Sequence, residues 1–151
     1  MSALAARWLA RPDSRVMALI GNGSQSEFQA LAFHRLVGIR EVRIFDVDHQ
    51  ATAKLERNLA AMPELAGLHV IRAASVTEAC RGADAVVHLA IASGHEGDYE
   101  DDAFNQLRFD VNVKGTLHVF EAAARCGVKR IVYTSSLTVV WGYGPEEYVG
   151  P

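Results

Sequence analysis

The feature that most constrains this 151-residue sequence is the stretch at residues 19–26, where an apolar run breaks at two glycines and continues into a helical pattern. Gly21 suits the backbone angles of a tight strand-to-helix turn, and Gly23 lets a ligand approach the backbone without an intervening side chain. The helix that follows presents free backbone amides and the positive end of its dipole at the same place. Together these properties predict a phosphate-binding turn at the start of an α/β unit.

The rest of the chain repeats this strand–helix unit. Strands are expected at residues 15–20, 42–45, 69–71, 85–89 and 130–134, and helices at residues 24–37, 51–61, 75–81 and 103–125. A leading helix within residues 1–13 precedes the first strand, and residues 137–151 are expected to form an irregular tail. The alternation predicts one Rossmann-type domain over residues 1–151, with three α/β/α layers and a five-stranded parallel sheet in the order 3-2-1-4-5.

Composition narrows the kinds of partner. A net charge of -3 gives no general electrostatic reason to bind nucleic acid or an anionic membrane. The sequence has neither an apolar run of about 18 residues nor a signal peptide, so we expect a cytoplasmic protein. The six histidines show no H-x-x-x-H spacing, and Cys80 and Cys126 are far apart, so no metal site is predicted. A small-molecule partner is favoured.

The second predicted strand ends at Asp46, about 25 residues after the glycine turn, which is the arrangement that dinucleotide binding requires. A carboxylate there can accept hydrogen bonds from both hydroxyls of the adenosine ribose and would repel a 2′-phosphate. The spacing therefore predicts NAD, with NADP less favoured. The alternatives are that the glycines form only a turn and that Asp46 is a solvated loop carboxylate.

Four stretches of the first half carry a family resemblance: Ser2–Arg7, Gly21–Gln25, Phe45–Asp48 and Ala79–Asp84. Residues 1 to about 84 resemble the NAD(P)-binding domain of the ornithine cyclodeaminase/mu-crystallin family. The resemblance implies that the loop at residues 21–25 holds the pyrophosphate of NAD or NADP. The family's substrate-binding lysine and arginine and its catalytic aspartate belong to a separate substrate domain, which we do not expect in this sequence.

Three motifs of the second half carry a different resemblance: Val87–Ala90, Asn112–Thr116 and Val132–Ser136. Residues 83 to 142 resemble an extended short-chain dehydrogenase/reductase of the NAD-dependent epimerase/dehydratase or hydroxysteroid dehydrogenase type. This resemblance implies that Ala90 lies beside the dinucleotide, that the helix carrying Asn112 supports the sheet, and that Ser136 stands at the catalytic-serine position. Such enzymes also use a tyrosine followed four residues later by a lysine as acid and base, and no tyrosine here has that partner. Ser136 is therefore predicted to be the remnant of an incomplete catalytic set.

The two resemblances meet near residues 83–87, inside one predicted strand, and the hypothesis that explains this is an engineered chimera of two Rossmann-type domains. Its predicted function is to bind a nicotinamide dinucleotide without turnover. The predicted cofactor-binding residues are Gly21, Asn22, Gly23, Ser24, Gln25, Asp46 and Ala90. One alternative is a designed fold with no ligand affinity, and another is a truncated NAD-dependent reductase or epimerase whose acid/base group comes from a partner chain. The apolar side chains of the leading helix, Leu4, Trp8 and Leu9, are a candidate homodimer contact.

Overall fold

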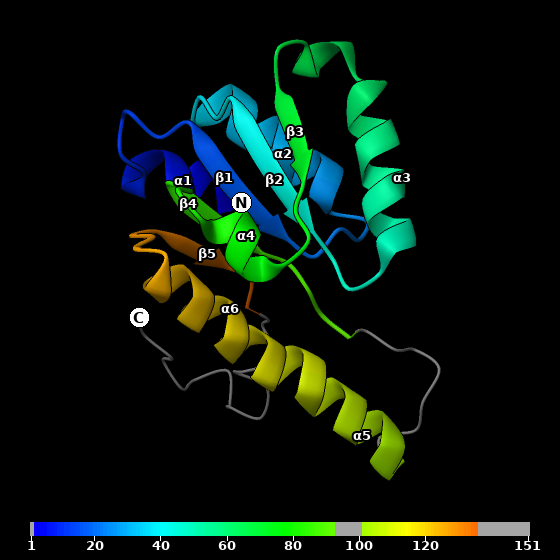
Figure 1. The fold of residues 1–151 in the computed structure, drawn as a ribbon. Helices are drawn as coiled ribbons and strands as arrows, with labels where there is room; N and C mark the ends of the chain where they lie inside the picture. The colour runs from blue at the N-terminus through cyan, green and yellow to red at the C-terminus, as the bar shows by residue number, and fades with distance from the viewer. Residues whose placement is uncertain (1, 93–100, 136–151) are drawn as a thin grey trace, which may run out of the picture.

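The computed structural model describes residues 2–92 and 101–135, so Ser136 and the predicted tail at 137–151 lie outside the described residues. Five strands form one sheet: β1 (Val16–Ile20), β2 (Glu41–Phe45), β3 (His69–Arg72), β4 (Ala85–His88) and β5 (Ile131–Tyr133). Every neighbouring pair is parallel, and the order across the sheet is β3-β2-β1-β4-β5 (Figure 1). This confirms the predicted parallel sheet and its strand order.

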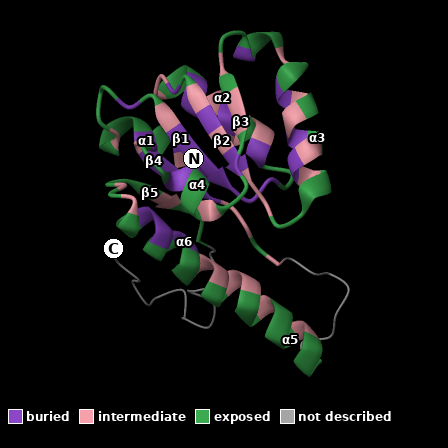
Figure 2. Cartoon of the chain, viewed as in Figure 1, coloured by how far each residue is buried: buried purple, intermediate pink, exposed green. Residues whose placement is uncertain are grey.

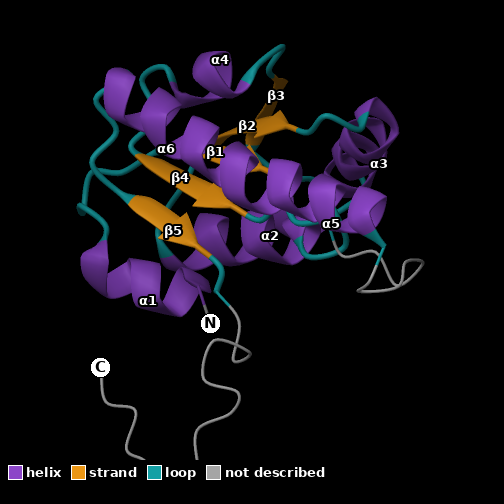
Figure 3. Cartoon of the chain, turned by 90° about the horizontal axis from the view of Figure 1, so that it is seen from below, coloured by secondary structure: helices purple, strands orange, loops and turns teal. Residues whose placement is uncertain are grey.

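Helices cover both faces of the sheet, as the alternating pattern predicts (Figure 3). One face carries α1 (Ser2–Leu9), α2 (Ser26–Leu36) and α3 (His49–Ala60), and the other carries α4 (Val76–Cys80) and α6 (Gly115–Arg125). A short 3-10 turn at Pro63–Leu65 lies between α3 and β3. The fold is therefore a three-layer Rossmann-type α/β/α arrangement.

The core divides into two apolar clusters, one on each face of the sheet. In β1, Met17 and Leu19 belong to the cluster under α1, α2 and α3, whereas Ala18 and Ile20 belong to the cluster under α4 and α6. This follows from the strand period of two residues, which sends neighbouring side chains to opposite faces. Because both faces are covered, the central strands are apolar throughout rather than alternating.

The leading helix α1 turns its small residues inward. Ala3 and Ala6 are buried, and α1 packs beside α2. The larger apolar side chains, Leu4, Trp8 and Leu9, remain on the surface, with Trp8 83 % exposed. Small residues at the contact allow two helices to approach closely.

The predicted helix at 103–125 is one continuous helical stretch with an irregular middle. It consists of α5 (Asp102–Arg108), a π-helical segment η2 (Phe109–Lys114) and α6. Asp101 caps its start by accepting a hydrogen bond from the backbone amide of Ala103 at 2.9 Å. No residue of α5 or η2 is buried, and the buried residues of the stretch all belong to α6 (Figure 2). Sequence periodicity did not reveal the π-helical turn.

Replacing Gly21 by alanine is expected to destabilise the fold. Gly21 has a φ of +92°, and a Cβ atom there would lie 2.3 Å from the backbone nitrogen of Ala90. We expect the Gly21→Ala variant to lose about 2 kcal/mol or more in free energy of unfolding, from backbone strain and overlap together. Urea unfolding followed by circular dichroism measures this loss.

Gly23→Ala is the matched control, because no atom lies within 4 Å of the Cβ position at Gly23. Its free energy of unfolding should stay within about 0.5 kcal/mol of the wild-type value. Equal losses in the two variants would contradict the assigned role of Gly21.

Candidate functional site

A cleft of about 350 Å³ opens at the carboxyl ends of the central strands, where α/β sheets of this kind bind ligands. Its lining residues come from the glycine turn, the end of β2, the segment after β4 and η2. They are Gly21, Gly23, Ser24, Gln25, Ser26, Asp46, Val47, Leu89, Ala90, Ile91, Ala92 and Val111. The structure thus brings together every predicted cofactor-binding residue except Asn22.

The glycine turn is fixed between two strands. The Gly21 amide donates a hydrogen bond to the carbonyl of Phe45 at 3.0 Å, and the Leu89 amide donates to the carbonyl of Ile20 at 2.7 Å. The turn consequently lies against the backbone after β4, where only a residue without Cβ fits. Gly23 lines the cleft with empty space at its Cβ position, which leaves its backbone open to a ligand.

The turn also presents unpaired backbone donors. Helix α2 begins at Ser26, two residues later than predicted, and the Ser26 amide donates to the carbonyl of Gly23 at 3.1 Å. No described residue accepts a hydrogen bond from the backbone amides of Ser24 and Gln25. Both residues line the cleft at the positive end of the α2 dipole. This part of the cleft therefore suits an anion.

Asp46 has a structural role that its spacing in the sequence does not reveal. Its Oδ2 accepts a hydrogen bond from the Asn22 amide at 2.6 Å, and its Oδ1 accepts one from the Asp48 amide at 2.9 Å. The half-buried carboxylate thus ties the glycine turn to the end of β2. Each carboxylate oxygen can accept a second hydrogen bond, so Asp46 can still bind a hydroxyl group in the cleft.

The Asn22 side chain does not reach the cleft. It is 3 % exposed, and its Nδ2 donates to the Thr52 hydroxyl at 2.9 Å. Thr52 belongs to the first turn of α3, so this bond joins the glycine turn to the neighbouring helix. The Asn22 Oδ1 atom is buried without a partner among the described residues. Burial of this kind depends on the position of α3, which the sequence motif does not specify.

A chain of hydrogen bonds holds the opposite wall of the cleft. The Thr116 hydroxyl donates to the carbonyl of Asn112 at 2.7 Å and lies 3.0 Å from His88 Nε2. Since the hydroxyl proton of Thr116 already forms the hydrogen bond with Asn112, His88 Nε2 must be the donor to the Thr116 oxygen. The Asn112 Oδ1 accepts from the Ala92 amide at 2.8 Å, which fixes the segment after β4. The helix carrying Asn112 therefore supports the sheet, as the resemblance implied.

Burial lowers the pKa of His88. His88 is 1 % exposed, its Nδ1 has no partner among the described residues, and its ring lies 5.4 Å from the ring of Tyr133. These surroundings favour the neutral imidazole, with its single proton on Nε2. His88 is therefore a packed strand residue.

Two classes of site are not found among residues 2–92 and 101–135. These residues contain no group of three or more histidine, cysteine, aspartate or glutamate side chains arranged to hold a metal ion. No helix within them has the length and apolar character needed to cross a bilayer.

Residues 1–98 match the model of the ornithine cyclodeaminase/mu-crystallin family. The chain belongs to this family. An ornithine cyclodeaminase of Agrobacterium tumefaciens (strain Ach5) is 52 % identical over 125 residues, covering 83 % of this family member and 32 % of the relative. The chain therefore spans about a third of that relative's length. This finding agrees with the resemblance carried by the first half of the sequence.

A solved structure of Thermococcus litoralis Δ1-pyrroline-2-carboxylate reductase, in complex with NADH and L-proline, superposes on this family member with a TM-score of 0.51. The two are 25 % identical, and the match covers 58 % of this chain and 26 % of the other. Weaker matches in the rest of the chain are to hydroxysteroid dehydrogenases. One is isoform 2 of a 3β-hydroxysteroid dehydrogenase/decarboxylase of Arabidopsis thaliana, 39 % identical over 66 residues, covering 44 % of this chain and 11 % of that protein.

The buried His88 is expected to make stability depend on pH. Because its folded-state pKa lies below the ordinary value of 6.5, protonation favours the unfolded chain. The contribution of neutral His88 is complete above that ordinary value and is lost as the pH falls below it, with a slope of at most about 1.4 kcal/mol per pH unit. Urea unfolding at about pH 7.5 and about pH 5.5 measures the loss.

The comparison variant is His88→Gln, which keeps a polar side chain but cannot titrate in this range. Its free energy of unfolding should fall less between the two pH values than that of the wild type. The same pH dependence in both proteins would show that another group is responsible.

Proposed function

We propose that this chain binds a nicotinamide dinucleotide, NAD in preference to NADP, in the cleft between the glycine turn and the segment after β4. The observation that carries the proposal is the convergence on one cleft of open backbone at Gly23, a carboxylate at Asp46, and amides at Ser24 and Gln25 that no described residue accepts. The solved relative in complex with NADH supports the same ligand class. The residues present fit the pyrophosphate and the ribose of an adenosine diphosphate group.

Each part of the cleft has a matching part of the ligand. Backbone amides at the start of α2 would bind the pyrophosphate, whose negative charge the helix dipole also favours. Asp46 would accept hydrogen bonds from the adenosine ribose through its remaining lone pairs. Val47, Ile91 and Val111 supply apolar lining for the base. When bound, the nicotinamide group supplies hydride transfer.

The preference for NAD rests on charge. Among the described residues, those that line the cleft include Asp46 and no lysine, arginine or histidine. A 2′-phosphate would therefore meet a carboxylate without a compensating cation, whereas a 2′-hydroxyl would meet a hydrogen-bond acceptor.

We also propose that binding occurs without turnover, in a single domain over residues 1–151 that joins two Rossmann segments near residues 83–87. The weaker hydroxysteroid dehydrogenase matches are the observation behind this proposal, and the ornithine cyclodeaminase match over 125 residues, which runs across residues 83–87, weighs against the join. The three lysines, Lys54, Lys114 and Lys129, do not follow any tyrosine at a spacing of four. Ser136 alone can orient a carbonyl but has no proton-transfer partner of that type.

A second candidate function is a reductase or epimerase whose acid/base group comes from another chain, and the same dehydrogenase matches favour it. Turnover of a sugar or steroid substrate with NAD, lost in Ser136→Ala, would establish this function over binding alone.

NAD is expected to raise the melting temperature of the wild-type protein, with a stabilisation that grows as the logarithm of its concentration above the Kd. Gly23→Ala should bind NAD about tenfold more weakly, because its methyl group enters the cleft, while melting normally without ligand. Thermal unfolding and isothermal titration calorimetry measure both effects. A folded protein with no response to millimolar NAD would favour the alternative of a fold without ligand affinity.

Asp46→Ala is expected to weaken the binding of NAD more than the binding of NADP, and to change the ratio of the two Kd values by about tenfold. The reason is that a hydrogen bond to a charged group is worth about 1.5–3 kcal/mol. Asp46 also anchors the glycine turn, so both ligands should lose some affinity. Measuring both ligands by calorimetry on the same variant cancels that shared loss. Equal losses would refute the ribose role.

A further inference from the structure

We propose that the amino edge of the sheet, at the opposite end of the strands from the cleft, binds single-stranded nucleic acid. This edge holds the loops that enter the strands and the last turns of the helices before them. Six exposed cations occupy it, and we call them the basic edge. They are Arg7, Arg15, Arg35, Arg40, Lys129 and Arg130.

Hydrogen bonds and packing bring the basic edge together from separate parts of the chain. The Arg40 amide donates to the carbonyl of Arg15 at 2.8 Å, so the loops that enter β1 and β2 are neighbours. The Arg130 Nε donates to the carbonyl of Leu9 at 2.9 Å, which joins the entry of β5 to the end of α1. Helices α1 and α2 pack together, and each carries one of the arginines in its last turn. The six cations therefore belong to one surface.

The cations of the basic edge are not neutralised within the described part of the chain. None of them has a carboxylate at ion-pair distance there. Asp13 pairs instead with Arg11. The Asp84 carboxylate accepts hydrogen bonds from the backbone amides of Arg15 and Val16 at 2.7 and 3.0 Å. Both carboxylates are thus already engaged, and the edge keeps a positive potential that attracts a polyanion.

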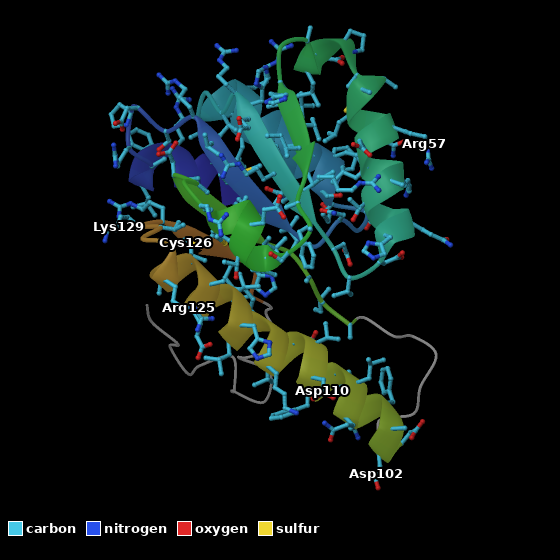
Figure 4. All side chains as sticks on the ribbon, in the orientation of Figure 1. Arg57, Asp102, Asp110, Arg125, Cys126 and Lys129 are labelled. Atoms are coloured by element: carbon cyan, nitrogen blue, oxygen red, sulfur yellow. The ribbon has the colours of Figure 1, made fainter. Side chains whose placement is uncertain are left out.

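Several acidic side chains lie toward the other end of the molecule. Asp46 directly follows β2 and lines the cleft, and Asp102 begins α5. Figure 4 shows Asp102 and Asp110 well away from Arg125 and Lys129, which precede β5. The net charge of -3 thus conceals an uneven distribution, so it does not exclude a polyanionic partner for the basic edge.

The residue types favour a nucleic acid among polyanions. Five of the six cations are arginines, whose planar guanidinium groups bind phosphate through two hydrogen bonds at once. Trp8 follows Arg7 in the last turn of α1 and is 83 % exposed, so its ring can stack on an unpaired base. The cations follow the sheet edge from β2 to β5 as a row roughly 15 Å long, which suits the backbone of a single strand. A bilayer surface would instead require an amphipathic helix with a long apolar face, whereas α1 has 8 residues.

Fluorescence anisotropy of the full chain with a labelled oligouridylate of about 20 nucleotides, longer than the usual single-strand site, measures this binding. We expect a Kd of about one micromolar at about 50 mM salt. Neutralising about five phosphates of a single strand gives a slope of about -3.5 in the logarithmic salt dependence of the binding constant. The Kd should therefore rise about a hundredfold between about 50 and about 200 mM salt.

Charge reversal tests which surface binds. Arg40→Glu combined with Lys129→Glu should raise the Kd by about tenfold or more, because it replaces two phosphate contacts by repulsion. Neither side chain makes a hydrogen bond or ion pair to a described residue, so the fold should be kept, which circular dichroism checks. The matched control is Lys54→Glu with Arg57→Glu, an equal change of charge on α3, where Figure 4 shows Arg57 far from Lys129. Its Kd should stay within about twofold of the wild-type value.

The exposed aromatic ring gives a second readout that charge alone does not move. Trp8→Ala should raise the Kd about tenfold through lost stacking, and Trp8→Tyr should keep most of the affinity. Equal losses in these two variants would contradict the stacking role of Trp8.

Three results would overturn the proposal as a whole. They are no oligonucleotide binding by the folded wild type at low salt, equal losses in the two charge-reversed variants, and binding of phosphatidylglycerol vesicles without binding of oligonucleotide. Millimolar NAD should leave the oligonucleotide bound, because the cleft lies at the other end of the strands. Displacement by NAD would place the strand in the cleft and would also overturn the proposal. Oligonucleotide binding is measured without NAD, so its outcome is independent of the proposed NAD binding.

Discussion

The close contact between the glycine turn and the segment after β4 is the constraint on which the rest of the structure depends. A Cβ at Gly21 would lie 2.3 Å from the Ala90 nitrogen, so the first and fourth strands can end side by side only because that atom is absent. The same contact places the start of α2 at the carboxyl edge of the sheet, opposite Ala90. The cleft is thus a direct result of backbone packing, and its anion-binding character follows from the helix start that the packing exposes.

Hydrogen-bonded polar side chains at the two walls, buried or half-buried, keep this geometry in place. On one wall, Asp46 uses both oxygens to hold backbone amides, so a residue that would recognise a ligand also supports the turn. On the other, His88 donates to Thr116, and Asn112 holds the Ala92 amide. Buried polar groups are costly unless they are paired, so each wall tolerates few changes. A substitution at Asp46 therefore affects the shape of the site as well as its charge.

Among the described residues, exposed apolar side chains occur on α1 and along α5–α6 as well as in the cleft lining at Val47 and Ile91. The chain spans about a third of the length of the Agrobacterium ornithine cyclodeaminase that it matches. Exposed apolar patches generally mark interaction sites.

The sequence by itself determined the sheet order, the glycine turn and half of the cleft lining, because these depend on local signals: apolar strands, glycines at a fixed place and a carboxylate at the end of the second strand. Only the tertiary structure decided that the Asn22 side chain is buried against Thr52, that Asp46 anchors the turn, and that η2 is π-helical. These features depend on how α3 and α6 pack on the sheet. Contacts between residues distant in the chain leave no periodic signal in the sequence, so they could not be read from it.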